Sequence, residues 1–296
     1  MRCVRCLGSL LVGAALAGCG DSTRPVLLAI PPFLVVGDSG SVSHLYRVRD
    51  SAETQLTGGA WSDFDPSSAA GLIVFTSDRD GNFELYISDS TITLSRRITN
   101  STAEDRQPAL SPDGSTIVFV SNRSGAPRLW RVPAPALDAT SFDVPVALAT
   151  GSSAEIPEGA PAWSPDGSTL AFSSARSGTT QIFTMPAEGG NAVELTTDAG
   201  GAFSPAWSGD GQTIYYLSAA GTVHLRRIKS TGGTGTDFAS DSLDVDAPSC
   251  NSSVCIAAEN PAGDLGSILA FPEKGGKGQA IIPRTRNERQ AAILEP

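Results

Sequence analysis

The chain has 296 residues, and its 21 Lys and Arg side chains face 31 Asp and Glu side chains, so its formal net charge is −10 at neutral pH. An acidic surface repels phosphate backbones and anionic headgroups, so we expect no nucleic-acid partner and no electrostatic attachment to a membrane. The length fits one large all-β domain or two small ones and does not choose between them.

The N-terminal segment reads as a secretory signal, because Arg2 and Arg5 precede an apolar run from Leu7 to Ala17. The run is too short for a transmembrane helix, which needs about 20 apolar residues. It ends in Leu-Ala-Gly-Cys at residues 16–19, which resembles the lipobox of bacterial lipoproteins. The resemblance implies cleavage before Cys19 and lipidation of Cys19. The alternative is ordinary cleavage nearby, which would leave a soluble secreted protein.

Two cysteines leave with the signal, residues 1–18, and Cys19 would begin a lipidated tether, residues 19–32. Cys250 and Cys255 then remain outside the reducing cytoplasm, and we predict a disulfide between them. They make a poor zinc site, because zinc needs two more ligands and the two histidines, His44 and His224, are far apart in the sequence.

One phrase recurs three times in the middle of the chain, as QPALSPDGSTIVF at residues 107–119, APAWSPDGSTLAF at 160–172 and SPAWSGDGQTIYY at 204–216. Each copy contains a short strand, a turn rich in Pro, Asp and Gly, and a second strand, which together predict a hairpin. Two further strands follow each hairpin, and the unit repeats about every 44 residues.

Four strands per repeat at this period are typical of a β-propeller blade. Six second strands can be counted, at residues 33–36, 72–76, 116–120, 169–173, 213–217 and 254–258. We therefore predict an all-β chain with a single six-bladed propeller of four-stranded blades over residues 33–296. Residues 288–296 repeat the pattern of residues 104–112, so we expect the C-terminal strand to complete blade one and close the ring. The alternative is that Val26 to Ile30 supplies that strand.

The Ala-Trp-Ser-Pro-Asp-Gly phrase at residues 162–167, followed by Ser-x-Arg-x-Gly at 174–178, resembles the repeat of TolB-type propellers. Relatives of prolyl oligopeptidase carry similar propellers. The resemblance covers residues 33 to 296 and implies the fold, but it does not imply a function. TolB has an α/β domain before its propeller and the oligopeptidase relatives carry a hydrolase domain, so neither role is carried over.

Two sets of recurring polar residues have a structural interpretation. We interpret the aspartates as turn residues that bond their own backbone, at Asp113, Asp166 and Asp210. We interpret the arginines as blade-building residues that bond the carbonyls of a neighbouring loop, at Arg79, Arg123 and Arg176. The alternative for the arginines is a guanidinium ring that holds an anion.

The sequence offers little catalytic chemistry. The segment from Asp78 to Asn82 departs from the EF-hand spacing, so we expect no metal and no cofactor. His44 and His224 occupy the same position of blades one and five, which are not adjacent. No HExxH, G-x-S-x-G or Walker motif occurs. We therefore expect no catalytic residues, and an extracytoplasmic lyase or hydrolase acting on a polymer is the alternative function.

The favoured function is that of a monomeric binding or scaffolding protein, anchored by its lipid in the bacterial envelope and facing the periplasm or the exterior. It would present one propeller mouth to a protein, peptide or glycan. The loops that lead into the first strands supply the predicted partner-binding residues, Asp105, Arg106, Glu158, Asp246, Glu288 and Arg289. Such a mainly acidic set favours a partner with cations or hydrogen-bond donors. The alternative is that these are solvated loop charges.

Overall fold

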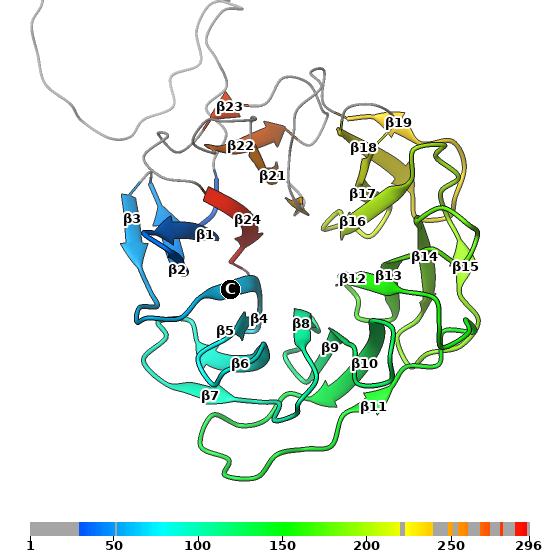
Figure 1. The fold of residues 1–296 in the computed structure, drawn as a ribbon. Helices are drawn as coiled ribbons and strands as arrows, with labels where there is room; N and C mark the ends of the chain where they lie inside the picture. Colours follow the sequence, from blue (N-terminus) through cyan, green and yellow to red (C-terminus); the bar gives the residue numbers. More distant parts are fainter. Residues whose placement is uncertain are drawn as a thin grey trace, which may run out of the picture.

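The computed structural model describes residues 30–50, 52–219, 223–238, 248–250, 254–259, 267–272, 279–280 and 288–294. These residues form six antiparallel sheets of four strands, arranged as blades around one axis (Figure 1). The predicted six-bladed propeller is therefore confirmed. No helix occurs in the described ranges, and so none there could cross a membrane.

The four strands of each blade lie side by side, with the first strand nearest the axis and the fourth at the rim. In blades two to six this order is also the order along the chain. Blade one contains β24 (Glu288–Ile293), β1 (Phe33–Ser39), β2 (Val42–Arg49) and β3 (Ala52–Gln55). Blade two contains β4 (Asp63–Ala69), β5 (Leu72–Ser77), β6 (Glu84–Asp89) and β7 (Ser95–Arg97). Blade three contains β8 (Asp105–Leu110), β9 (Thr116–Ser121), β10 (Arg128–Pro133) and β11 (Val146–Ala147).

The other three blades follow the same plan. Blade four contains β12 (Glu158–Trp163), β13 (Thr169–Ser174), β14 (Gln181–Pro186) and β15 (Val193–Glu194). Blade five contains β16 (Ala202–Trp207), β17 (Thr213–Ser218), β18 (His224–Lys229) and β19 (Thr236–Asp237). Blade six contains β20 (Ser249–Cys250), β21 (Val254–Glu259), β22 (Ser267–Pro272) and β23 (Gln279–Ala280). All six second strands lie where the repeat predicts them.

The ring is closed by pairing strands from opposite ends of the chain. Strand β24 pairs antiparallel with β1, with Ile293 opposite Phe33 and Ala291 opposite Val35. This confirms that the C-terminal strand completes blade one. Residues 26–29 of the alternative segment lie outside the described residues, and β24 holds the innermost place. Closure leaves no open sheet edge at this junction.

The core lies between the blades rather than within one sheet. Six apolar clusters fill the six junctions, and each draws its side chains from two neighbouring blades. Between blades two and three, for example, Val74 and Leu85 pack with Ile117 and Phe119. The second strand of each blade is buried on both faces, which is why it reads as a continuous apolar run in the sequence.

The Pro-Asp-Gly turns carry the local hydrogen bonds expected for their aspartates. Asp166 Oδ1 accepts bonds from the Ser164 hydroxyl at 2.6 Å and the Ser168 N–H at 3.0 Å. These bonds lower the pKa of Asp166 to about 2. Gly167 supplies the left-handed backbone of the turn, with φ of 70°. The equivalent bonds at Asp113 and Asp210 confirm the interpretation of all three aspartates as turn residues.

Cys250 and Cys255 lie opposite each other in β20 and β21, and their sulfur atoms are 2.09 Å apart, at bonding distance. The register places Cys250 where blades four and five have Trp163 and Trp207, opposite Leu170 and Ile214 respectively. The cysteine pair thus stands where blades four and five place a Trp and an aliphatic residue.

We predict that replacing both Cys250 and Cys255 by Ser lowers the free energy of unfolding by about 2 kcal/mol, because the bond closes a short loop in the unfolded chain. Denaturant unfolding measures the loss. Alkylation of the unreduced, denatured protein followed by peptide mass spectrometry should label neither sulfur. Two labelled thiols would contradict the bond.

Candidate functional site

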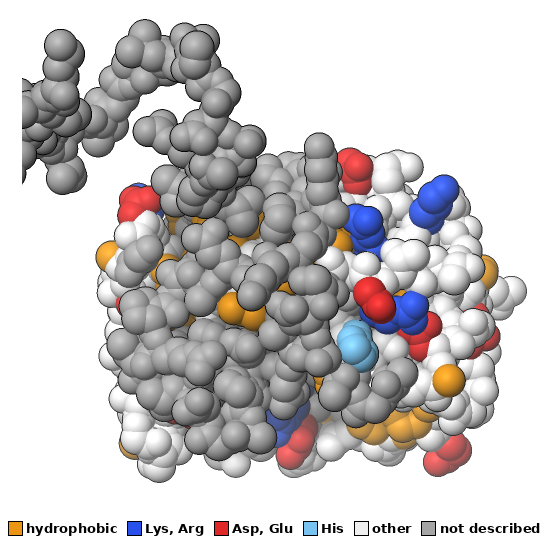
Figure 2. All heavy atoms as spheres, turned by 90° about the horizontal axis from the view of Figure 1, so that it is seen from above, with side chains coloured by type: hydrophobic (Ala, Val, Ile, Leu, Met, Phe, Trp, Pro, Cys, Tyr) orange, Lys and Arg blue, Asp and Glu red, His pale blue; other side chains and the backbone are white. Residues whose placement is uncertain are grey.

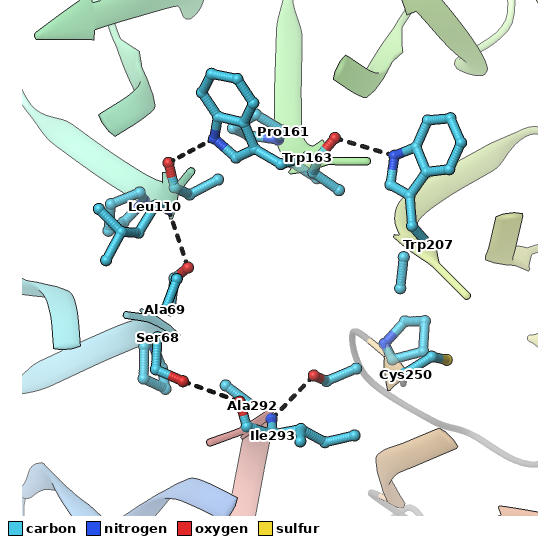
Figure 3. A pocket seen from close by; sticks show the side chains of 18 of the residues that line it. Ser68, Ala69, Leu110, Pro161, Trp163, Trp207, Cys250, Ala292 and Ile293 are labelled. Atoms are coloured by element: carbon cyan, nitrogen blue, oxygen red, sulfur yellow. Dashed lines mark hydrogen bonds between the residues drawn. The ribbon is translucent and has the colours of Figure 1, made fainter. Parts of the chain in front are cut away.

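A cavity of about 640 Å³ lies on the axis of the ring, inside the six first strands (Figure 3). Its wall is made mainly of small and rigid side chains, including Pro66, Pro108, Pro161, Pro205, Pro248, Ala69, Ala109, Ala162, Ala206 and Ala292. Pro112, Pro165 and Gly209 of the Pro-Asp-Gly turns line it as well. The cavity therefore extends along the first strands to the face that carries these turns.

Five first strands bulge where they border this cavity. In each, one residue other than glycine has a left-handed backbone with φ between 47° and 52°, at Asp65, Gln107, Ala160, Ser204 and Gln290. The register shifts at the same places. A left-handed conformation is uncommon for such residues, and it persists only where surrounding contacts enforce it. At three of these bulges, Asp65, Gln107 and Ala160, the backbone N–H donates to a side chain of the neighbouring blade.

The bulge residues of blades one to four form a hydrogen-bonded series, which we call the bulge chain. Gln290 Oε1 accepts from the Asp65 N–H at 2.9 Å, and Asp65 Oδ2 accepts from the Gln107 N–H at 3.2 Å. Gln107 Oε1 in turn accepts from the Ala160 N–H at 2.9 Å. Each side chain thereby fixes the backbone of the next bulge around the cavity.

A second set of hydrogen bonds joins the first strands closer to the Pro-Asp-Gly turns (Figure 3). Trp163 Nε1 donates to the Ala109 carbonyl at 3.0 Å, and Trp207 Nε1 donates to the Ala162 carbonyl at 3.2 Å. Where an aliphatic residue replaces the Trp, a serine of the preceding blade accepts from its N–H instead, in the pairs Leu110 to Ser67 and Ile293 to Ser249. The wall of the cavity is therefore held by directed bonds.

Asp65 is the one charged side chain among the described residues that line the cavity. Burial raises the pKa of Asp65, although hydrogen bonds donated by Gln107, Thr76 and Gln290 act in the opposite direction. The described lining includes no Lys, Arg or His. Its remaining polar groups are hydroxyls, carboxamides and backbone amides, which suit the recognition of an uncharged polar ligand.

Two of the predicted partner-binding residues are buried, which differs from the exposed loop charges we expected. Asp105 lies 2.6 Å from Arg123 Nη2, and the Asp105 side chain is fully buried. Glu158 lies 3.0 Å from Arg128 Nε and 2.7 Å from Arg176 Nη2. Asp105 and Glu158 begin strands β8 and β12, so their side chains turn into the blade. They are therefore unavailable to a partner.

The recurring arginines complete the same clusters. Arg79, Arg123 and Arg176 each bond the acid that begins the first strand and the serine that ends the second strand of their own blade. Each guanidinium also lies over an aromatic ring of the third strand, at Tyr86, Trp130 or Phe183. The blade-building interpretation is confirmed, with the correction that carboxylates are the shared partners, whereas the loop carbonyl we expected is bonded by Arg176 alone of the three.

Of the other four predicted partner-binding residues, only the side chain of Arg106 lies in the described part of the structure. Arg106 is partly exposed, pairs with Glu104 at 3.2 Å and covers the ring of Phe83. Asp246 lies outside the described residues. Glu288 and Arg289 begin β24, but their side chains lie outside the described part. A partner contact by Arg106, Asp246, Glu288 and Arg289 stays a prediction.

The two histidines lie in the third strands of blades one and five, which are not adjacent. His44 is near the start of β2, and His224 is the first residue of β18. His44 is buried, and its Nδ1 lies 3.7 Å from Asp63 Oδ2. Within the described ranges, no three His, Cys, Asp or Glu side chains gather in an arrangement that could hold a metal ion.

The rim of the ring has a mixed charge. Figure 2 shows acidic and basic side chains next to each other, and close to a histidine, on the part of this side that the grey atoms leave visible. In blade five, Arg226 pairs with Asp198 at 2.7 Å and with Asp237 at 3.0 Å. Such paired charges give the rim no single sign with which to attract a partner over a distance.

The sequence reasoning missed the bulge chain. One signal was available, because four of the five bulge residues precede a Pro in the same repeat position, as in Gln107-Pro108, and the fifth precedes an Ala, in Gln290-Ala291. The residue before Pro is biased away from the helical region, but that bias does not predict a left-handed bulge.

The site and fold together define a closed six-bladed propeller whose first strands wall a central cavity. The profile of the TolB beta propeller domain matches residues 146–287. The chain thus carries a TolB-like β-propeller. Among curated proteins, it is 33% identical over 132 residues to "Protein TolB homolog" of Chlorobaculum tepidum, a match covering 43% of this chain and 27% of that protein.

A second curated relative is the "Tol-Pal system protein TolB" of Anaeromyxobacter dehalogenans strain 2CP-C, 33% identical over 124 residues, which cover 42% of this chain and 24% of that protein. The matches therefore span about a quarter of the length of these relatives. Among solved structures, TolB from Acinetobacter baumannii superposes with a TM-score of 0.75 at 18% identity, covering 90% of this chain and 67% of that chain.

A putative TolB from Agrobacterium tumefaciens superposes with a TM-score of 0.68 at 15% identity, covering 90% of this chain and 94% of that chain. A puromycin-hydrolyzing peptidase from Mycobacterium tuberculosis has a TM-score of 0.59 at 14% identity, covering 84% of this chain and 43% of that chain. Identities this low show a shared fold and leave function open.

We predict that Glu158→Ala lowers the free energy of unfolding by about 3 kcal/mol, because the change leaves Arg128 of blade three and Arg176 of blade four without their shared buried carboxylate. Glu104→Ala is the matched control, since its ion pair with Arg106 is exposed and contributes less than about 1 kcal/mol. Urea unfolding of both variants measures the difference. Equal losses would mean that the buried cluster does not stabilise the blade.

A second prediction concerns Asp65. Its raised pKa means that the folded state holds its proton to a higher pH than the unfolded state does, so the stability it contributes below about pH 4 is lost as the pH rises through the folded pKa. Asp65→Asn removes this titration. Its melting temperature relative to the wild type should therefore increase from pH 4 to pH 8.

Asp166→Asn is the control for this measurement, because the pKa of Asp166 is lowered and its contribution is present throughout that range. Its melting temperature relative to the wild type should be lower by a constant amount. A pH-independent difference for Asp65→Asn would refute the assignment of Asp65.

Proposed function

We propose that this chain is a non-catalytic binding or scaffolding protein of the bacterial envelope, and that its central cavity receives a segment of a partner protein. The observation that carries the proposal is the cavity itself. It holds about 640 Å³ on the axis where the first strands converge, and its wall is rigid. A preformed wall reduces the entropic cost of ordering a binding site.

The chemistry of the lining supports binding over catalysis. General acid–base catalysis needs titratable groups within reach of the reacting atoms, most often a pair. The described lining offers a single carboxyl, that of Asp65, and it is engaged by three donors. The remaining groups can donate and accept hydrogen bonds to an extended peptide.

The comparisons support a protein partner, because one relative is named for its place in the Tol-Pal system. We further propose that the chain is held in the envelope by lipid on Cys19, after removal of residues 1–18. Residues 1–29 lie outside the described part, so this anchor rests on the sequence of residues 16–19. The lipid would tether a mature protein whose acidic surface gives it no attraction of its own to the membrane.

Site-specific photo-cross-linking in intact cells tests the binding site. A benzoylphenylalanine at Pro112, which is exposed and lines the cavity, should give a discrete adduct with one envelope protein. The same group at Val144, which is 83% exposed and does not line the cavity, should not give that adduct. Adducts from Val144 alone, or the same adducts from both positions, would place binding elsewhere.

A second experiment in the same cells tests the lipid anchor. Cys19→Ser should move the protein from the membrane to the soluble fraction, and retention in the membrane would contradict the anchor.

A further inference from the structure

The bulge chain follows one rule wherever the bulge residue has a side chain that reaches the next blade. The side chain of each bulge residue points across the junction and accepts a hydrogen bond from the N–H of the next bulge residue. Gln290, Asp65 and Gln107 obey this rule at three successive junctions, with N···O distances of 2.9, 3.2 and 2.9 Å. The left-handed backbone of each bulge is what aims its N–H at the preceding blade.

The rule fails at the junction between blades four and five, because the bulge residue of blade four is Ala160. Its methyl group offers no acceptor to Ser204, the next bulge residue. Ser204 nevertheless has the same backbone, with φ of 51° against 47° at Ala160. Both residues line the cavity. No side chain in the described ranges accepts a hydrogen bond from the Ser204 N–H.

The two junctions on either side of blade four share one hydrogen bond. Trp207 bonds the Ala162 carbonyl across one junction as Trp163 bonds the Ala109 carbonyl across the other, at 3.2 and 3.0 Å. By analogy, the Ser204 N–H is directed toward Ala160, in the way that the Ala160 N–H is directed toward the Gln107 carboxamide. The two junctions differ in one side chain: Gln107 supplies a carboxamide between blades three and four, whereas Ala160 supplies none between blades four and five.

Ser204 is half-buried and lines the cavity, so its N–H is available to an acceptor group of a bound ligand. The other junctions show which chemical groups fit, since a glutamine oxygen accepts at two of them and the Asp65 carboxylate accepts at the third. A carboxylate from a ligand is disfavoured there. Asp65 borders the same cavity, the described lining holds no cation, and the chain has a net charge of −10.

We propose that the cavity recognises a glutamine side chain of the partner segment, whose carboxamide oxygen accepts from the Ser204 N–H in the gap beside Ala160. The bound glutamine thereby continues the bulge chain into blade five. This inference rests on the proposed function, because it names the group of the partner that enters the cavity. It assigns specificity to a backbone donor rather than to a charged side chain.

The test uses the full-length protein, with N-acetyl-L-glutamine amide as the soluble probe and N-acetyl-L-glutamate amide as the charged comparison. In the wild type, the glutamine compound should shift the amide NMR resonance of Ser204, and the glutamate compound should bind about tenfold more weakly. Ala160→Gln should supply the missing acceptor from the chain itself. That variant should show a Ser204 amide already shifted in the absence of probe, and at least a tenfold loss of probe binding.

Ala70→Gln is the matched control, because Ala70 also lines the cavity and also has a left-handed backbone, with φ of 50° against 47° at Ala160. Ala70 lies in the turn between the first two strands of blade two. This variant should leave probe binding unchanged. The proposal is overturned if the probe leaves the Ser204 resonance of the wild type unmoved, or if Ala160→Gln binds as tightly as the wild type. The wild-type titration decides the matter even if Ala160→Gln does not fold.

The cross-linking at Pro112 separates this inference from the proposed function. If the partner adduct forms equally in Ala160→Gln and the wild type, the glutamine site is refuted and the proposed function stands. If the probe binds at Ser204 but no adduct forms at Pro112, the proposed function is refuted and the site stands.

Discussion

The structure depends on hydrogen bonds that cross from the first strand of one blade to the first strand of the next. Apolar packing between blades is strong but has no direction, so it does not by itself fix how far each sheet stands from the axis. The bulge chain and the bonds of Trp163 and Trp207 set that distance at several junctions. The left-handed bulges are the local strain that these bonds maintain, and the central cavity exists because they hold the strands apart.

The blades are equivalent in outline but not in chemistry. Blades two, three and four share the buried acid, serine and arginine cluster, whereas blade five begins its first strand with Ala202. The Ser218 hydroxyl that would receive an arginine has no hydrogen-bond partner among the described residues. Arg226 stands instead where blades two, three and four have an aromatic ring, and it pairs with Asp198 and Asp237. Blade five, which follows the junction where the bulge chain stops, therefore lacks the cluster that stabilises the three blades before it.

The sequence predicts the fold well because blade formation is governed by local turn chemistry, which the repeated Pro-Asp-Gly phrase displays directly. It also predicts the closing strand, because β24 repeats the pattern of β8. It does not predict that Asp105 and Glu158 are buried, because a charged residue at the start of a strand cannot be distinguished by its residue type from the exposed charged residues of the preceding loop. Their burial depends on Arg123 and Arg176, which lie in a different turn. The cavity is also not predicted by the sequence, because it is lined by bulges in five first strands that lie far apart along the chain.

The closing pair of strands has a kinetic consequence. Phe33 and Ile293 lie opposite each other although roughly 260 residues separate them along the chain, so the ring has one contact of very high sequence separation. Each other blade can assemble from neighbouring segments as a local unit. Pairing β24 with β1 closes a loop that spans the five other blades, so we expect this step to follow the assembly of those blades. Completion of the ring is thus a late step of folding, and an interrupted ring would expose the edge of β1 to strand exchange with another chain.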